Sequence, residues 1–319
     1  MVFTLIYLII GFCILIAGAN FLVEGASSLA KRLRVSDLAI GLSVVALGTS
    51  TPELFVNIFA SFQGNSEIAI GNILGSNIFN ILVILGLSSL IFPLAVTKGT
   101  VWKEIPFSFL AVLVLGAIVN DVFFDKMNSS FIGRIDGFVL ISFFLIFMYY
   151  IASIAKDTEL LNPSDIKPRS ISKSLMMISG GIVGLVFGGN FVQTSAVAIA
   201  SSLGVSQSLI GLTIVATGTS LPELATSAIA ASKKNSDIAV GNIVGSNIFN
   251  IFFVLGISAL IKPLPVITQI NADIAVLILS SLFLFLFMFT GKRRIIDRWE
   301  GGVFIALYAG YLIFLIKRG

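Results

Sequence analysis

Histidine is absent from this chain of 319 residues, and cysteine occurs once, as Cys13 within an apolar run. These absences exclude haem ligation, zinc sites built from His or Cys, a histidine general base and an intramolecular disulfide. Charged residues are also scarce, at 11%, whereas 57% of the residues are hydrophobic and the mean hydropathy is +1.05. Soluble domains carry about 25% charged residues, so the composition indicates an integral membrane protein.

Apolar stretches long enough to cross a membrane recur along the whole chain. A helix needs about 20 apolar residues to cross about 30 Å of hydrocarbon. The first stretch lacks a basic segment before it and is too long for a signal peptide, so we expect it to stay in the membrane. We predict ten spans, at 2–29, 37–61, 67–92, 102–120, 132–155, 172–201, 207–231, 237–261, 272–290 and 300–316.

Basic residues are distributed unevenly between alternate connections of these spans. The positive-inside bias places the richer set in the cytoplasm. We therefore predict a multi-pass protein of the cell membrane, with both termini extracellular and the loop 156–173 cytoplasmic. Fifteen of the 20 Lys and Arg residues follow spans 1, 3, 5, 7 and 9: Lys31, Arg32, Arg34, Lys98, Lys103, Lys156, Lys167, Arg169, Lys173, Lys233, Lys234, Lys292, Arg293, Arg294 and Arg298.

The two halves of the chain repeat each other. At an offset of 170 residues, 41–60 matches 211–230 and 65–94 matches 235–264 without a gap. Five spans per repeat is an odd number, so the second copy must cross the membrane in the opposite direction, as in secondary transporters with inverted repeats. We divide the chain into a first repeat at 1–155 with its motif at 41–94, a linker at 156–173, and a second repeat at 174–319 with its motif at 211–264.

Two carboxylates lie in the middle of spans, at equivalent positions of the repeats. Glu53 and Glu223 have no Lys or Arg within spans 2, 3, 7 or 8 to compensate them. A charge at the centre of a membrane helix costs about 2.5 to 3.5 kcal/mol, so either a proton or a bound cation must offset it. Two neutral carboxylic acids that join helices by hydrogen bonds are the alternative interpretation. Glu24 lies near the end of span 1, and we interpret it as an interfacial charge.

Each of these glutamates follows a proline, within Gly-Thr-Ser-Thr-Pro-Glu at 48–53 and Gly-Thr-Ser-Leu-Pro-Glu at 218–223. Proline lacks an amide donor and clashes with the carbonyl four residues earlier, which frees backbone carbonyls. In lipid, freed carbonyls are tolerated only where they line a cavity or bind something. The pattern therefore predicts broken helices 2 and 7, with extra oxygen ligands from the neighbouring Thr and Ser.

A second repeated motif, Gly-Asn-Ile-Leu/Val-Gly-Ser-Asn-Ile-Phe-Asn, occupies 71–80 and 241–250. Its polar residues are four apart and share one helix face in each repeat. We expect this stripe to face the Pro-Glu helices and to bind an ion. The stripe consists of Asn72, Ser76 and Asn80 in span 3 and of Asn242, Ser246 and Asn250 in span 8.

These groups form an all-oxygen site with a charge of about minus two. Calcium accepts six to eight oxygens in flexible geometry, whereas magnesium demands a tight octahedron and keeps its waters. Soft transition metals prefer Cys or His. Calcium, with sodium as a competing hard ion, is therefore the predicted cargo.

The paired motifs resemble the two alpha repeats of sodium/calcium exchangers in the cation/calcium exchanger superfamily. The resemblance covers all ten spans. It implies an all-α membrane fold of ten helices in two inverted five-helix repeats, with the broken helices at the repeat interface. It also implies alternating access, in which spans 1 and 6 slide across a fixed core of spans 2, 3, 7 and 8.

The resemblance further implies a set of ion ligands. The Glu53 and Glu223 carboxylates with the Thr49 and Thr219 carbonyls correspond to calcium ligands. Asn80 and Asn250 correspond to the central pair, although several sodium/calcium exchangers have Asp in place of Asn250. The sodium ligands correspond to Ser50, Ser76 and the Ala216 carbonyl, and in the inverted twin to Ser220, Ser246 and the Ala46 carbonyl.

We therefore predict a secondary antiporter that exchanges Na⁺ for Ca²⁺ in the lipid bilayer, without a cofactor, a nucleic-acid partner or an implied protein partner. A proton-coupled calcium exchanger that uses the same two glutamates is the alternative. A channel would need a continuous pore, which two inverted broken-helix repeats do not suggest. An intramembrane enzyme would need a base beside Ser50 or Ser76, and the chain has no histidine, so we expect no enzymatic activity.

Overall fold

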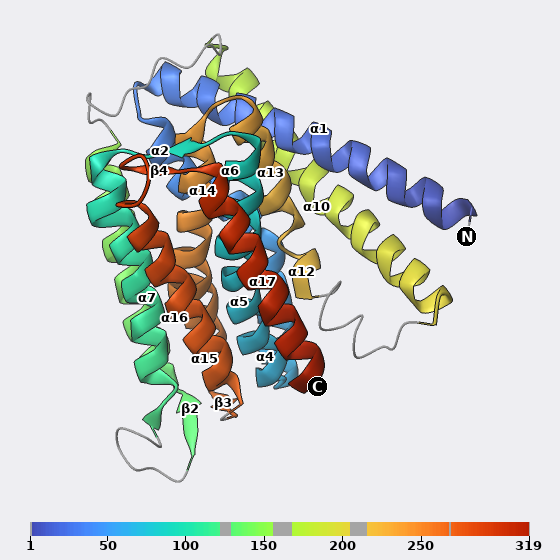
Figure 1. Ribbon diagram of the computed structural model, residues 1–319, viewed down its shortest axis with the longest axis vertical. Helices are drawn as coiled ribbons and strands as arrows, with labels where there is room; N and C mark the ends of the chain where they lie inside the picture. Colours follow the sequence, from blue (N-terminus) through green and yellow to red (C-terminus); the bar gives the residue numbers. More distant parts are fainter. Residues whose placement is uncertain (1, 122–128, 156–167, 205–215, 268, 319) are drawn as a thin grey trace.

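The computed structural model describes residues 2–121, 129–155, 168–204, 216–267 and 269–318, which form a bundle of long helices (Figure 1). The helical elements of the first half are α1 (Val2–Leu33), α2 (Asp37–Ile40), η1 (Gly41–Val45), α3 (Ala46–Thr49), α4 (Thr51–Gln63), α5 (Ser66–Phe79), η2 (Asn80–Leu85), α6 (Gly86–Ile91), η3 (Thr100–Glu104), α7 (Ile105–Ile118) and α9 (Arg134–Ile154). Those of the second half are α10 (Ile171–Ser202), α12 (Ala216–Gly218), α13 (Leu221–Ser232), α14 (Ser236–Ile248), η6 (Phe249–Leu255), α15 (Gly256–Ile261), α16 (Ile270–Phe287) and α17 (Arg298–Arg318).

The observed helices follow the predicted spans closely. Within the described residues, eight helices are long and apolar enough to cross a membrane, and the bent pair Asp37–Thr49 and Thr51–Gln63 makes a ninth. The predicted span 207–231 lies partly outside the described residues, which include its end as α12 and α13. Most of the predicted linker, at 156–167, also lies outside them.

The third span of each repeat begins in the same way, with a residue in the left-handed conformation followed by an asparagine that caps the helix. Gly64 ends α4 with φ 74°, and its counterpart Lys234 adopts φ 56° after α13. Asn65 then caps α5 by accepting a hydrogen bond from the amide of Ile68 at 3.2 Å, and Asn235 caps α14 in the same way. An Asn at the N-cap satisfies an amide that the helix leaves free, so each tight turn leads directly into the next span.

The continuous helices α5–η2–α6 and α14–η6–α15 form the centre of the bundle. Their spans, 66–91 and 236–261, are more buried than the other continuous spans of the described chain. Close packing requires glycine here: a Cβ at Gly245 would lie 2.7 Å from the carbonyl oxygen of Leu42. The second Asn-containing motif therefore runs through the core, against the broken helix of the first repeat.

Helices α1 and α10 pack against each other along one flank, inclined to the central helices (Figure 1). Each has 32 residues, or about 48 Å at 1.5 Å per residue, which exceeds the hydrocarbon thickness and so requires tilt or protrusion. Glycines allow backbone contact between them: a Cβ at Gly181 would lie 2.6 Å from the Leu22 amide nitrogen, and one at Gly188 would lie 2.6 Å from that of Leu15. The two helices thus form one tightly packed unit.

Two short antiparallel pairings join connections at opposite ends of the bundle and add to the expected all-α fold. β1 (Leu94–Ala95) pairs with β4 (Ile295–Ile296), and β2 (Ser130–Ile132) pairs with β3 (Leu264–Val266). Figure 1 shows β4 at one end and β2 with β3 at the other. β1 and β4 lie in the connections after spans 3 and 9, and β2 and β3 lie in those after spans 4 and 8. In a chain of ten spans, connections after odd-numbered spans lie on one side of the membrane and those after even-numbered spans on the other. Each pairing therefore joins two connections on the same side.

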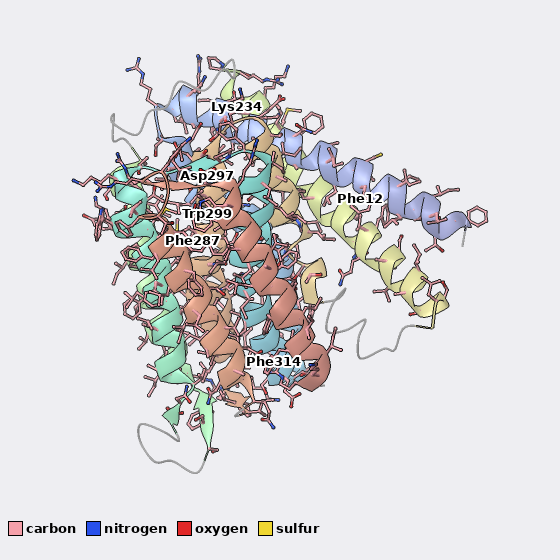
Figure 2. All side chains as sticks on the ribbon, viewed as in Figure 1. Phe12, Lys234, Phe287, Asp297, Trp299 and Phe314 are labelled. Atoms are coloured by element: carbon pink, nitrogen blue, oxygen red, sulfur yellow. The ribbon has the colours of Figure 1, made fainter. Side chains whose placement is uncertain are left out.

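Side chains mark the two ends and the outer surface of the bundle (Figure 2). Lys234 and Asp297 lie towards the end that carries β4, whereas Phe314 lies near the opposite end. Phe12 projects from α1, where it is exposed. At the Lys234 end, Glu24 forms ion pairs with Arg169 at 2.9 Å and with Lys233 at 3.0 Å, in accord with its interpretation as an interfacial charge.

Candidate cation-binding site

The two Pro-Glu motifs interrupt their helices at the same point. Ser50 separates α3 from α4 with φ −80° and ψ 9°, and Ser220 precedes α13 with φ −87° and ψ 6°. The helices on either side of Ser50 differ in direction by 48°. Proline occupies the first turn of α4 and of α13, where its missing amide removes no hydrogen bond from the new helix.

Both predicted glutamates lie at these breaks and are fully buried. Glu53 and Glu223 fall in the first turns of α4 and α13, and each is 0% exposed. A helix N-terminus carries a partial positive charge that favours an acidic side chain. The fold thus places each carboxylate where the helix itself partly offsets its charge, but this partial charge does not replace a counterion.

Serines of both repeats hydrogen-bond to these carboxylates. Ser220 donates to Glu53 Oε1 at 3.1 Å, and Ser50 donates to Glu223 Oε1 at 2.9 Å. Each glutamate is therefore bound by the serine that precedes the other repeat's proline. Within their own repeats, Ser76 lies 3.4 Å from Glu53 Oε1 and Ser246 lies 3.5 Å from Glu223 Oε1.

The central asparagines lie on π-helical turns of the two core helices. Asn80 begins η2, and Asn250 lies in η6. Such turns widen a helix locally and are frequent at functional sites. The Asn80 amide donates to Asn247 Oδ1 at 2.9 Å, and the Asn250 amide donates to Asn77 Oδ1 at 3.0 Å. These bonds fix both side chains through their amide nitrogens, while their amide oxygens accept no hydrogen bond.

The buried atoms of the described residues that lack a hydrogen-bond partner include four acceptor oxygens of this site, two from each repeat: Glu53 Oε2, Glu223 Oε2, Asn80 Oδ1 and Asn250 Oδ1. The ion pairs found among the described residues do not involve either glutamate. A buried polar atom without a partner costs about 1 to 3 kcal/mol, and more if it is charged. The arrangement is therefore suited to a hard cation, which accepts oxygen ligands of this kind.

The remaining residues of the predicted stripe position the threonines of the breaks. Thr49 donates to Asn242 Oδ1 at 3.0 Å, and Thr219 donates to Asn72 Oδ1 at 3.3 Å, so this pairing also crosses between repeats. Asn72 in turn donates to Asn57 at 2.7 Å. The Asn72 and Asn242 side chains are thus occupied by these hydroxyl groups rather than left free for an ion.

The two alanines whose carbonyl groups are predicted ligands lie at the start of the short helical segments before the breaks. Ala46 begins α3, and its carbonyl oxygen accepts hydrogen bonds from the Ser50 amide at 2.9 Å and from the Thr49 hydroxyl at 3.2 Å. Ala216 begins α12, directly after residues that the structure does not describe. Both are therefore within one turn of the serines of their own motif.

Helix α10 packs directly over both breaks. A Cβ at Gly48 would lie 2.6 Å from Ile182 Cδ1, and one at Gly218 would lie 2.4 Å from Gln193 Cδ. Glycine at the start of each Gly-Thr-Ser-x-Pro-Glu motif thus makes room for a side chain of α10. The unit of α1 and α10 is in contact with both halves of the site at once.

The chain shows extensive similarity to one family of transporters. The sodium/calcium exchanger protein family matches residues 3–152 and 173–317. The chain belongs to the sodium/calcium exchanger family. Sodium/calcium exchanger MaX1 of Methanosarcina acetivorans is 32% identical, with 97% of each chain covered, and inner membrane protein YrbG of Escherichia coli (strain K12) is 32% identical, with 97% of this chain and 94% of the relative covered. The solved structure of the sodium-calcium exchanger NCX_Mj soaked with zero Na⁺ and Ca²⁺ superimposes with a TM-score of 0.83 at 34% identity, covering 98% of this chain and 99% of the other.

These similarities confirm the predicted class of protein. The protein is an all-helical, multi-pass membrane protein with the ten-helix inverted-repeat fold, and it is a transporter rather than an enzyme. The resemblance inferred from the Pro-Glu and Ser-Asn motifs is likewise confirmed.

Two asparagines of the site could not be identified from the spacing of the motif, because they lie off the predicted stripe. Asn77 and Asn247 hold Asn250 and Asn80, and the Asn77 amide also donates to the Asn247 carbonyl oxygen at 3.2 Å. They follow Ser76 and Ser246 by one position, so the i, i+4 spacing excluded them. Their presence in both copies of the motif was the signal that could have identified them.

Proposed function

We propose that this protein is a secondary antiporter that exchanges Na⁺ for Ca²⁺ across the cell membrane by alternating access. The observation that carries the proposal is the set of four buried acceptor oxygens without partners, two from glutamates and two from asparagines, contributed by both repeats. One Ca²⁺ would neutralise the two carboxylates and supply the missing contacts at the same time.

For calcium, we propose the carboxylates of Glu53 and Glu223 and the carbonyls of Thr49 and Thr219 as ligands. Glu53 lies in the first turn of α4, and Glu223 lies in the first turn of α13. Each threonine comes directly before the serine at which its helix breaks. The hydroxyl groups of Thr49 and Thr219 donate to asparagines, which fixes the backbone orientation at these positions. The Asn80 and Asn250 oxygens complete the centre of the proposed site.

For sodium, we propose two flanking sites with hydroxyl and carbonyl ligands. One uses Ser50, Ser76 and the Ala216 carbonyl, and its inverted twin uses Ser220, Ser246 and the Ala46 carbonyl. The support for this assignment is that all four serine hydroxyls already lie within hydrogen-bond distance of the buried glutamates. In each of these hydrogen bonds the hydroxyl hydrogen is the positive contact of the carboxylate. A sodium ion bound between the serine oxygen and the glutamate would take the place of that contact.

We propose that α1 and α10 move together to expose the site to alternate sides. Their glycine contacts make them one unit, and Ile182 and Gln193 of that unit lie against the two breaks. In this proposal the unit slides over a core of spans 2, 3, 7 and 8. The two five-helix repeats, 1–155 and 174–319 with the linker 156–173, would supply equivalent halves of the pathway.

We propose that both termini are extracellular and that the basic end of the bundle faces the cytoplasm. The positive-inside bias supports this orientation. The ion pairs of Glu24 with Arg169 and Lys233 support it further, because they gather basic residues from connections after spans 5 and 7 at one end.

Transport in vesicles tests the proposed coupling ion. Purified protein is reconstituted into vesicles loaded with Na⁺, and ⁴⁵Ca²⁺ uptake is measured after dilution into Na⁺-free medium, with and without a proton uncoupler. Vesicles loaded with K⁺ are the control. We expect uptake that requires internal Na⁺ and survives the uncoupler. Uptake that instead requires a proton gradient would contradict sodium coupling and support the proton-coupled alternative.

A further inference from the structure

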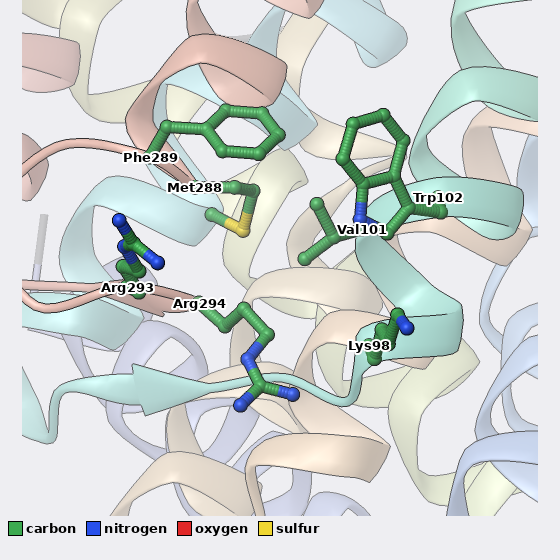
Figure 3. A pocket seen from close by; sticks show the side chains of 7 residues that line it. All are labelled: Lys98, Val101, Trp102, Met288, Phe289, Arg293 and Arg294. Atoms are coloured by element: carbon green, nitrogen blue, oxygen red, sulfur yellow. The ribbon is translucent and has the colours of Figure 1, made fainter.

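A cavity lies away from the glutamates, where the start of η3 meets the connection between α16 and β4. Its volume is about 520 Å³, and it is lined by Lys98, Val101, Trp102, Met288, Phe289, Arg293 and Arg294. Figure 3 shows the rings of Trp102 and Phe289 on one side of the cavity, and the cationic groups of Arg294 and Lys98 on the other. The wall is therefore divided into an apolar half and a basic half.

The basic half carries three positive charges without a carboxylate partner. Lys98, Arg293 and Arg294 are exposed, and the ion pairs of the described residues do not include any of them. Of the nearby carboxylates, Glu300 accepts from the Asp297 amide at 2.6 Å. One oxygen of Glu104 accepts from the Tyr150 hydroxyl, and the other is buried without a hydrogen-bond partner, so this single carboxylate leaves the three cations in excess. The charge available in this half therefore favours an anion.

The backbone holds Arg294 in place at the edge of the cavity. Its φ is 64°, in the left-handed region that non-glycine residues rarely adopt. Its amide donates to the Met288 carbonyl oxygen at 2.9 Å, and its own carbonyl oxygen accepts from the Val96 amide at 2.9 Å. The second bond continues the pairing of β1 with β4. A surface arginine is thus fixed by two connections that are distant in sequence.

The apolar half is exposed at the outer surface of the bundle. Trp102 is 58% exposed, and its ring packs edge-on against that of Phe289 with 5.4 Å between centroids. The buried Met288 lies between this pair and the basic residues (Figure 3). Exposed tryptophan beside basic residues is typical of the headgroup level of a membrane.

We propose that this cavity binds the phosphodiester headgroup of an anionic phospholipid. The three cations would bind the phosphate, while the acyl chains would lie along Trp102 and Phe289. A soluble anion would complement only the basic half and would leave the aromatic pair unused. Basic pockets at the cytoplasmic ends of membrane helices bind anionic headgroups in this manner. In the proposed orientation the lipid belongs to the cytoplasmic leaflet.

Quenching of Trp102 fluorescence by brominated lipids tests the proposal directly. The chain has two tryptophans, so Trp299→Phe leaves Trp102 as the only reporter. This variant is reconstituted in phosphatidylcholine that contains increasing fractions of brominated phosphatidylglycerol or brominated phosphatidylcholine. We expect the anionic lipid to quench more strongly at equal fractions, because each basic residue near an anionic headgroup contributes about fivefold in affinity.

Variants assign this preference to the cavity. Lys98→Gln/Arg293→Gln/Arg294→Gln should lower the relative affinity for phosphatidylglycerol by about tenfold or more. Lys98→Gln/Arg293→Gln, which keeps the strained Arg294, should lower it by a smaller factor. The matched control Arg32→Gln/Arg34→Gln/Lys173→Gln removes three exposed charges of the same end and should preserve the preference.

Three results would overturn the proposal. Equal quenching by the two brominated lipids would exclude selective binding. A preference that survives the triple variant would place the lipid elsewhere. Loss of the preference in millimolar inorganic phosphate, at constant ionic strength, would assign the cavity to a soluble anion instead of a lipid.

Discussion

The hydroxyl of Ser220 donates a hydrogen bond to the carboxylate of Glu53 at 3.1 Å, although the two residues belong to opposite repeats. The reciprocal bond from Ser50 to Glu223 is 2.9 Å long. Neither repeat therefore completes the surroundings of its own glutamate. The two halves of the chain must be assembled before either carboxylate has its full set of partners.

Ser220→Ala should weaken calcium transport without unfolding the protein. A hydrogen bond to a charged group contributes about 1.5 to 3 kcal/mol, so we expect the calcium concentration for half-maximal uptake to rise by about tenfold or more. ⁴⁵Ca²⁺ uptake as a function of calcium concentration measures this change. Ser232→Ala is the control, because Ser232 is exposed at the end of α13 and, within the described part of the chain, its hydroxyl donates only to the Ile229 carbonyl oxygen. Equal uptake by Ser220→Ala and Ser232→Ala would show that the cross-repeat bond is dispensable.

Gly181→Ala should disrupt the unit of α1 and α10. The added methyl group would lie 2.6 Å from the Leu22 amide nitrogen and 2.8 Å from the Gly18 carbonyl oxygen, both backbone atoms. Overpacking of this kind costs about 1 to 3 kcal/mol, so we expect a lower melting temperature and slower exchange. Its neighbour provides a matched control, since a Cβ at Gly180 meets no atom within 4 Å. If both variants melt and transport alike, the two helices do not depend on this contact.

Cysteine labelling tests the orientation in the membrane. In a Cys13→Ala background, a reagent confined to the outside of cells should label Lys317→Cys and should miss Lys173→Cys. Both positions are exposed at helix ends, so accessibility within the protein does not distinguish them. The reverse pattern of labelling would refute the proposed orientation and leave the fold unchanged.

Membrane potential tests how many sodium ions move with each calcium. Two Na⁺ for one Ca²⁺ would move no net charge, whereas three Na⁺ would move one positive charge outward with sodium. A potential of 100 mV contributes about 2.3 kcal/mol per charge. We expect an inside-positive potassium diffusion potential to increase Na⁺-driven calcium uptake. Uptake that ignores the clamped potential but still requires Na⁺ would indicate two-for-one exchange.

The sequence predicted those features that depend on local chemistry. Proline before each glutamate specifies a helix break, and the structure breaks at Ser50 and before α13. The pairing of Ser220 with Glu53 could not be predicted, because it depends on how two helices from different repeats pack. The π-helical turn that begins at Asn80 has no signal in apolar periodicity. The same limit explains why Asn72 was expected beside an ion and lies instead against Thr219.

Equilibrium binding of ⁴⁵Ca²⁺ to purified protein tests the central claim, that Glu53 and Glu223 together hold the ion. Each of Glu53→Gln and Glu223→Gln removes half of the proposed site's charge from a buried position. Removing one partner of a buried charged interaction costs about 2 to 5 kcal/mol, or about 30-fold to 4,000-fold in affinity. Glu67→Gln is the matched control, because Glu67 is exposed in the first turn of α5.

We expect the unmodified protein and Glu67→Gln to bind calcium with equal affinity, and Na⁺ to compete with it. We expect each site variant to lose binding by at least about 30-fold while it remains monodisperse and helical by circular dichroism. Near-normal calcium binding by a folded Glu53→Gln or Glu223→Gln protein would contradict the account.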